Sequence, residues 1–296
     1  MGLEILDGVF NESAFAKEIY GNLHQAIASG TGAEIKAKAI RRLWDGYGFR
    51  KNNQPSYMRK AFEESVALDP DNAIANFELG LELANVKDYA RAREALLRVV
   101  ELDNTYRDML KSLIDALATG EQVPAKLDAV VAYRKALLAL AANDSHAAEE
   151  LLGEALKLDP ALPAAQLMLG YVLTKQDRFQ GADATLRQYL EVTESPNVDA
   201  FAHMALIHAE NNRPDEASAT LEELFRKSPN ARKVYGSLMR ALAEGGDFQA
   251  AAASVRAFWS GFDARRQGRD AEAREAFAKA AALDPGNAFA QLEYGL

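Results

Sequence analysis

A short phrase, Leu-Asp-Pro, recurs along this chain and constrains its fold more than any other feature. After each copy comes a segment with apolar residues at helical spacing, and after every copy but the last a second such segment follows. Because proline cannot continue a helix, each copy marks the end of one helix. The recurrence therefore predicts a regular series of helix pairs. The three full copies and one weaker copy are Ala67-Leu68-Asp69-Pro70, Lys157-Leu158-Asp159-Pro160, Ala282-Leu283-Asp284-Pro285 and Arg226-Lys227-Ser228-Pro229.

Consecutive units aligned on this phrase cover residues 39–287 without a gap, and most of them are 34 or 35 residues long. Two units have only 22 residues, and each contains a glycine-bearing turn, at residues 120–124 and 244–247. After that turn we expect a single long helix, over residues 125–142 and 248–268, which closes one unit and opens the next. The units begin at Ala39, Ala73, Arg107, Ala129, Pro163, Val198, Arg232 and Ser254.

The 34-residue unit resembles the tetratricopeptide repeat family, in which each unit is a helix–turn–helix. Glycine and alanine lie where the family's two helices touch, because a larger side chain would push the helices apart. The resemblance implies an all-α fold, a right-handed superhelical solenoid of tetratricopeptide-type repeats that the two short, unpaired units interrupt. In the unit from Ala73, the positions that carry the resemblance are Leu79-Gly80, Leu83, Ala92, Leu96 and Val99.

The two ends of the chain depart from the repeat. Residues 1–38 do not fit the unit; they include a predicted amphipathic helix over residues 11–28, and we interpret them as a helical cap. Residues 39–287 form the predicted solenoid. Residues 288–296 begin a further repeat and stop inside its first helix, so we expect either a longer protein or self-association through this end. The uncovered apolar side chains there are Phe289, Leu292 and Leu296.

The composition excludes several classes of function. Without any cysteine, the chain has no disulfide, thiol nucleophile or thiolate metal site. Its net charge of −9 is opposite to the basic footprint that nucleic-acid binding needs. No apolar run is long enough to span a bilayer, and the first residues do not resemble a secretory signal. The compartment stays open between the cytoplasm and, if a signal was removed, the periplasm, and the alanine-rich composition suggests a bacterial source.

We expect no catalytic residue, no cofactor and no metal, and therefore no enzyme. Catalysis requires a nucleophile with a base, a metal cluster or paired carboxylates in a pocket. His203 and His208 are five residues apart on one predicted helix, so they point to different faces and cannot share a metal ion. Neither Gly30-Thr31-Gly32 nor Gly46-Tyr47-Gly48 has the remaining glycine of a phosphate-binding loop.

The first helices of the units are expected to line a long concave surface, which offers a binding groove. Members of the family that bind chaperone C-termini do so with a lysine–asparagine clamp on this surface. The matching positions in two windows hold neither residue, so we do not expect chaperone-tail binding. These positions are Tyr133, Leu137, Met168, Asp199 and His203 in one window, and Leu43, Tyr47, Glu78, Asp108 and Ser112 in the other.

The predicted groove is instead apolar and aromatic. Residues 43–47 and 258–262 are near-copies, and each is followed by a basic pair, as is typical of binding hot spots. The alternative is that many of these side chains pack against the neighbouring helix in the core. The candidate partner-binding residues are Trp44, Tyr47, Phe77, Leu81, Tyr133, Leu137, Leu167, Met168, Tyr171, His203, Phe258, Trp259 and Phe262.

Three functional hypotheses follow from this pattern. The first is a non-catalytic scaffold for protein–protein interaction, which binds a protein or peptide segment in the apolar groove. The second is a regulatory or substrate-recruiting arm of a larger enzyme, such as a glycosyltransferase, or of a machine for polysaccharide synthesis or export. The third is a periplasmic or assembly protein.

Overall fold

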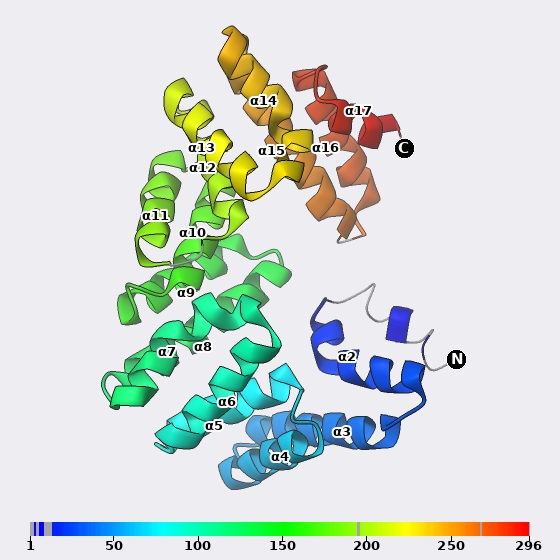
Figure 1. The fold of residues 1–296 in the computed structure, drawn as a ribbon, viewed down its shortest axis with the longest axis vertical. Helices are drawn as coiled ribbons and strands as arrows, with labels where there is room; N and C mark the ends of the chain where they lie inside the picture. The colour runs from blue at the N-terminus through cyan, green and yellow to red at the C-terminus, as the bar shows by residue number, and fades with distance from the viewer. Residues whose placement is uncertain (1–2, 4–5, 9–13, 194–195, 267, 296) are drawn as a thin grey trace. The chain divides into compact units, whose positions relative to one another are not determined.

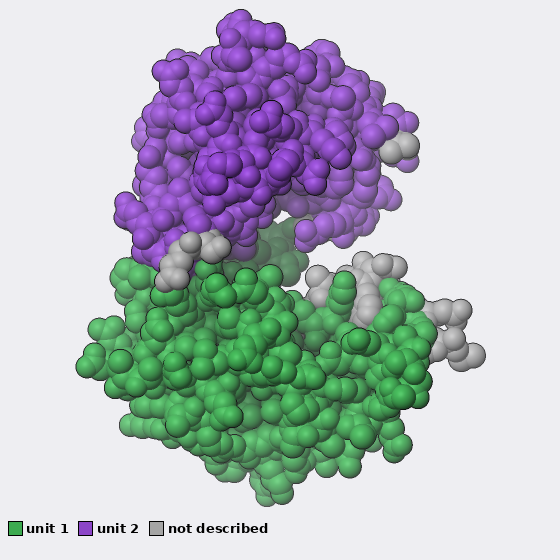
Figure 2. Space-filling view, viewed as in Figure 1, with its two compact units in different colours: residues 1–162 green, residues 163–296 purple. Residues whose placement is uncertain are grey.

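The fold of the chain is given by a computed structural model that describes residues 3, 6–8, 14–193, 196–266 and 268–295 (Figure 1). Throughout these ranges the regular secondary structure is helical, without a strand. The expected all-α solenoid of helix pairs is therefore confirmed. The chain divides into two compact units, residues 1–162 (unit 1) and residues 163–296 (unit 2), which Figure 2 colours separately. Leu296 and residues 11–13 of the predicted N-terminal helix lie outside the described residues.

Unit 1 is built from three helix pairs, α3 with α4, α5 with α6, and α8 with α9. A further helix, α7, packs against α6 and α8, and α2 packs against α3 and α5. The helices and one 3₁₀ turn are α2 (Ala14–Ser29), α3 (Ala33–Lys51), α4 (Pro55–Leu68), α5 (Ala73–Asn85), α6 (Tyr89–Leu102), η1 (Asn104–Tyr106), α7 (Arg107–Thr119), α8 (Val123–Ala141) and α9 (Ser145–Leu158).

Unit 2 repeats this plan with the pairs α10 with α11, α12 with α13, and α15 with α16. The single helix α14 packs against α13 and α15, and α17 packs against α16. Its elements are α10 (Pro163–Lys175), α11 (Phe179–Val192), α12 (Val198–Glu210), α13 (Pro214–Lys227), η2 (Pro229–Ala231), α14 (Arg232–Glu244), α15 (Phe248–Arg266), α16 (Asp270–Leu283) and α17 (Ala288–Gly295).

Glycines in the first helices allow the helices of a pair to approach closely. A Cβ added at Gly80 of α5 would lie 2.5 Å from Leu96 of α6, and one at Gly170 of α10 would lie 2.6 Å from Leu186 of α11. A side-chain cap fixes where the second helix α6 begins. Asp88 accepts the backbone N–H of Arg91 at the start of α6. The repeat positions that carry the family resemblance are thus helix contacts.

The two short units produce the unpaired helices that the sequence predicts. Among the described helices, α7 and α14 stand outside the six helix pairs, and each is followed by a helix of 19 residues, α8 or α15. The observed bounds, Val123–Ala141 and Phe248–Arg266, agree closely with the predicted ranges 125–142 and 248–268. Gly120 and Gly245 turn the chain between the two helices with φ of 78° and 71°.

The N-terminal segment has the same arrangement, and this equivalence with the other two segments is not predicted from the sequence. α2 is a single helix, Gly30 with φ 71° follows it, and α3 has 19 residues, like α8 and α15. The described part of the chain therefore contains this sequence of a single helix, a three-residue turn and a long helix three times. Whether residues 1–38 act as a cap stays a prediction.

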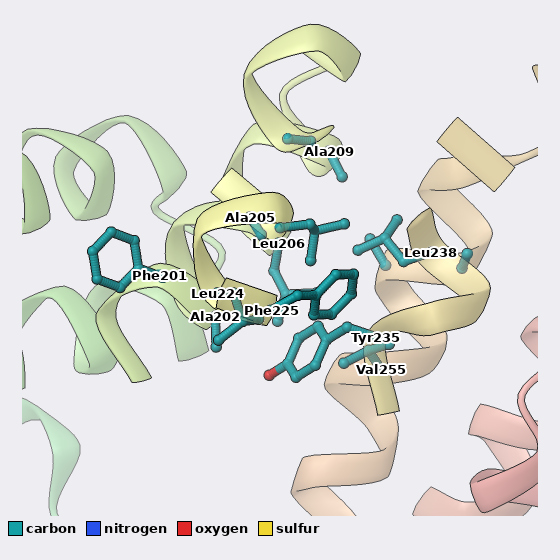
Figure 3. Close-up of a cluster of buried hydrophobic side chains, with 14 residues drawn as sticks. Phe201, Ala202, Ala205, Leu206, Ala209, Leu224, Phe225, Tyr235, Leu238 and Val255 are labelled. Atoms are coloured by element: carbon teal, nitrogen blue, oxygen red, sulfur yellow. The ribbon is translucent and has the colours of Figure 1, made fainter. Parts of the chain in front are cut away.

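A continuous apolar cluster holds the helices of unit 2 around α14 (Figure 3). Leu206 comes from α12, Leu224 and Phe225 from α13, Leu238 from α14 and Val255 from α15. Because all five are buried, the single helix α14 contributes to the same core as the pairs beside it.

Candidate functional site

The first helices of the pairs form a row in each unit, which we call the first-helix surface. It consists of α3, α5 and α8 in unit 1, and of α10, α12 and α15 in unit 2. α5 contacts α8 directly, and α12 contacts α15. The single helices α7 and α14, which come between them in the sequence, are therefore not part of the row. This row is where the sequence predicts a binding groove.

A buried carboxylate joins the three first helices of unit 1. The Glu78 side chain on α5 is fully buried, and the Tyr47 hydroxyl of α3 donates to its Oε1 over 3.0 Å. Arg50 of α3 lies 2.6 Å from Oε2, and Arg134 of α8 lies 2.8 Å from Oε1. Burial, together with the negative charge of Glu78, raises the pKa of Tyr47. Since these groups satisfy one another, we interpret this cluster as a structural link between helices.

A second polar link joins α10 to α15 in unit 2. The Tyr171 hydroxyl donates to Oδ2 of Asp263 over 2.9 Å, and Lys175 Nζ donates to the same oxygen over 2.5 Å. The Lys175 ammonium also lies 4.7 Å from the centre of the Tyr171 ring. Burial acts to raise the pKa of Asp263, but the hydrogen bonds from Lys175 and Tyr171, together with the positive charges of Lys175 and Arg266, lower it below its ordinary value.

His203 of α12 lies beside this link. Its ring meets that of Tyr171 nearly edge-on, with centroids 5.2 Å apart, and its Nδ1 is buried without a hydrogen-bond partner among the described residues. Burial lowers the pKa of His203 to about 4, and the charge of Lys175 lowers it further in the same direction. The imidazole is therefore neutral at neutral pH.

Two tryptophans occupy equivalent places on the long helices α3 and α15. The Trp44 Nε1–H donates to the Tyr20 hydroxyl of α2 over 3.0 Å, and the Trp259 Nε1–H donates to the Tyr235 hydroxyl of α14 over 2.9 Å. The two residues remain 46% and 43% exposed. Because their polar atom is already bonded, the exposed parts of both rings offer aromatic carbon for contact.

The surroundings of the two tryptophans repeat as well. Two residues after each tryptophan, a glycine packs against a phenylalanine of the next helix, and an arginine further along stacks on the same phenylalanine ring. The arginine then pairs with a glutamate of the following first helix. The equivalent sets are Gly46, Phe62, Arg50 and Glu78 in unit 1, and Gly261, Phe277, Arg265 and Glu293 in unit 2.

The structure divides the predicted partner-binding residues by exposure. Four are buried and pack in the core, as the alternative interpretation holds: Phe77, Leu81, Tyr133 and Phe258. Seven are partly buried: Tyr47, Leu137, Leu167, Met168, Tyr171, His203 and Phe262. Only Trp44 and Trp259 of this set are exposed. Whether any of them contacts a partner stays a prediction.

Sequence reasoning missed several polar residues of these surfaces. Tyr20 and Tyr235 each precede their tryptophan by 24 residues and are each followed by glycine, a signal that a comparison of the two segments finds. Asp263 lies 92 residues after Tyr171, and no local pattern connects the two.

Comparison with known proteins identifies the repeat. The tetratricopeptide repeat profile matches residues 51–107, 133–198 and 204–258, more than half of the chain. The chain belongs to the tetratricopeptide repeat family. Its matched segments extend from α3 to α15 and thus include residues of both units.

The tetratricopeptide chain is similar to known proteins of different lengths. It is 25% identical over 182 residues to the human Protein O-mannosyl-transferase TMTC3, a match that covers 60% of this chain and 19% of that protein. Among solved structures, it is similar to YrrB, described as a TPR protein with an unusual peptide-binding site, with 18% identity, a TM-score of 0.37, and 80% of this chain and all of that one covered. It is also similar to the TPR domain of P58(IPK), with 14% identity, a TM-score of 0.37, and coverage of 99% and 76%.

None of the helices that the structure describes has the length and apolar character to cross a membrane.

Proposed function

We propose that this tetratricopeptide chain is a non-catalytic scaffold that binds a segment of a protein partner on its first-helix surfaces. The observation that supports the proposal is the pair of half-exposed tryptophans, each held by a hydrogen bond to a tyrosine. A large aromatic side chain that is already oriented loses little conformational freedom on binding, and tryptophan is enriched at binding hot spots. Tetratricopeptide repeats in general serve protein–protein interaction.

Selection of peptides from a phage-displayed library on the purified chain tests this function. We expect the selected peptides to lose about 2 kcal/mol of binding free energy, roughly 30-fold in affinity, with Trp44→Ala or Trp259→Ala. Tyr57 is a matched control, because it is an exposed aromatic residue on the second helix α4. Tyr57→Ala should leave the affinity unchanged.

Unchanged affinity in both folded tryptophan variants would contradict the proposed function. Circular dichroism and the melting temperature establish that each variant is folded. Tyr133 is a poorer choice for this test because it is only 8% exposed, so its truncation would damage the core.

We also propose a second function, in which the scaffold recruits the substrate of a larger enzyme. The partial similarity to the human Protein O-mannosyl-transferase TMTC3 supports it, since the matched region is a small part of that protein. The sequence of the complete gene tests this proposal. A transferase domain in the same reading frame would support it, whereas a reading frame without one, together with the absence of a transferase among captured proteins, would contradict it.

A further inference from the structure

We propose that the chain binds two copies of the same short partner motif, one at a site around Trp44 in unit 1 and one at an equivalent site around Trp259 in unit 2. The motif carries an apolar side chain that packs on the exposed face of the indole ring. The proposal rests on the proposed function, and it specifies how many sites the chain has and what they recognise.

An exposed indole begins a stripe of rings and charge along α3. The ring centroids of Trp44 and Tyr47 lie 5.5 Å apart, and the guanidinium carbon of Arg50 lies 5.6 Å from the centre of the Tyr47 ring. Trp44 is exposed and the Arg50 side chain is 41% exposed, so both ends of the stripe are open to solvent. We call these three residues the unit 1 stripe.

The helix α15 carries an equivalent stripe with nearly the same distances. The ring centroids of Trp259 and Phe262 lie 5.8 Å apart, and the guanidinium carbon of Arg265 lies 5.7 Å from the centre of the Phe262 ring. Trp259 is exposed and the Arg265 side chain is 42% exposed. These three residues, the unit 2 stripe, therefore present the same groups in the same order: an indole, a second aromatic ring and a guanidinium.

The third long helix, α8, shows that the fold does not require such a stripe. Trp44 and Trp259 both come 14 residues after the turn glycine that precedes their helix, and the residue of α8 at this place is Arg134. Arg134 pairs with Glu78. In α7, the buried Leu110 occupies the place of the tyrosine that bonds to each tryptophan. Because α8 follows the same kind of turn and forms the same kind of helix pair, folding alone does not explain the two stripes.

A glycine directly follows the tyrosine of each site, Gly21 in α2 and Gly236 in α14. Both lie inside helices, where glycine is less favourable than alanine. A Cβ added at either position would meet nothing within 4 Å, so no contact in the described part of the chain requires glycine there. Lys111 occupies this place in α7. A glycine at these two positions allows the backbone of a partner to approach the helix closely.

The chemistry of the two stripes suits an apolar side chain with a main-chain carbonyl beside it. Each indole N–H is already bonded to a tyrosine hydroxyl, so the exposed ring offers carbon for packing. Each arginine has five N–H groups, of which the described residues accept one through a glutamate, so others can donate to a carbonyl. The net charge of −9 disfavours an acidic motif at the same place.

Isothermal titration calorimetry measures the number of sites. The probe is the tightest peptide from the phage selection, synthesised as a single copy. We expect two equivalents of peptide per unmodified chain, with dissociation constants within about tenfold of each other. Trp44→Ala and Trp259→Ala should each leave one equivalent, bound at the unaltered site. The 30-fold loss of affinity expected for each tryptophan variant therefore belongs to its own site, and the double variant should show it at both.

A variant of the third long helix and a second measurement complete the test. Leu138→Ala is the matched control, because Leu138 is an exposed apolar residue of α8 and belongs to neither stripe, and it should keep two equivalents. The chain has two tryptophans, so two indole N–H signals in nuclear magnetic resonance report on the sites separately, and Trp259→Phe assigns them. Both signals should shift over the same range of peptide concentration.

The two proposals fail through different results. One equivalent of peptide per unmodified chain, or a shift of only one indole signal, would overturn the inference of two sites and leave the proposed function in place. The proposed function fails instead if the folded double variant keeps the full affinity and stoichiometry of the unmodified chain.

Discussion

Glu78 and His203 occupy the same position of their repeats, the sixth residue of the first helix, but the surroundings of their side chains differ. Glu78 is fully buried, and a tyrosine and two arginines surround its carboxylate. His203 has a buried Nδ1 without a partner in the described part of the chain. A buried carboxylate needs such partners to stay charged, whereas an imidazole can remain neutral. Because a proton on the buried His203 ring would have no partner, the free energy of unfolding should depend on pH through this residue.

Acid should destabilise the protein through His203. In the folded chain its pKa is about 4, compared with the ordinary value of 6.5. As the pH falls below 6.5, the unfolded chain takes up a proton at this residue and the folded chain does not, so folding stability is lost between these two values. The loss amounts to about 3 kcal/mol at pH 4. Urea unfolding at several pH values should show a smaller loss for His203→Phe than for the unmodified chain.

The control for this measurement is His146→Gln. The His146 side chain is 86% exposed, and the variant should follow the pH dependence of the unmodified chain. If His203→Phe lost stability with acid as steeply as the unmodified chain does, the neutral buried imidazole would be ruled out.

At the scale of helices, close contacts between the two members of a pair determine where glycine is required. Gly170 and Gly153 are both inside helices, but only Gly170 touches a partner helix, where an added Cβ would lie 2.6 Å from Leu186. At Gly153 of α9 a Cβ would meet nothing within 4 Å. Substitutions at the two glycines therefore distinguish the effect of helix packing on stability from the effect of helix propensity.

Substitution by alanine should change stability in opposite directions at these two glycines. Gly170→Ala forces α10 and α11 apart and should destabilise the chain by about 1–3 kcal/mol. Gly153→Ala lowers the entropy of the unfolded chain and should stabilise it by up to about 1 kcal/mol. Thermal and urea unfolding measure both. A Gly170→Ala chain as stable as the unmodified one would show that the pair is not tightly packed there.

Local signals made the helices predictable from the sequence, because each signal acts within one or two turns. A Leu-Asp-Pro phrase ends a helix where it occurs, and the equal spacing of the two short units places α8 and α15. The equivalence of α2 with α14 was missed because little more than Tyr20-Gly21 and Tyr235-Gly236 connects their sequences.

The candidate site was only partly predictable, because exposure depends on packing between helices. Trp44 and Tyr133 both lie on first helices and were both candidates, but the structure exposes the first and buries the second. The bond between Tyr171 and Asp263 joins residues 92 positions apart, and it depends on how closely α10 and α15 approach. Such distances between helices depend on tertiary packing, which the local pattern of a single sequence does not specify.

At the scale of the whole molecule, the surface of α17 bears on association between copies of the chain. Phe289 packs against the cluster around Phe258, so part of the predicted apolar end is covered within unit 2. Leu292 and Tyr294 remain 56% and 58% exposed. Each offers a large apolar side chain for contact with another copy of the chain.

We expect the chain to self-associate weakly through α17, and sedimentation velocity at increasing concentration tests this. The average sedimentation coefficient should rise with concentration for the unmodified chain and should rise much less for Leu292→Glu, because a charge at the contact would have to be desolvated. Leu138→Glu is the matched control, since Leu138 of α8 is 71% exposed but lies in unit 1. It should associate like the unmodified chain. A monomer of 32.3 kDa at every concentration in all three proteins would exclude association through α17.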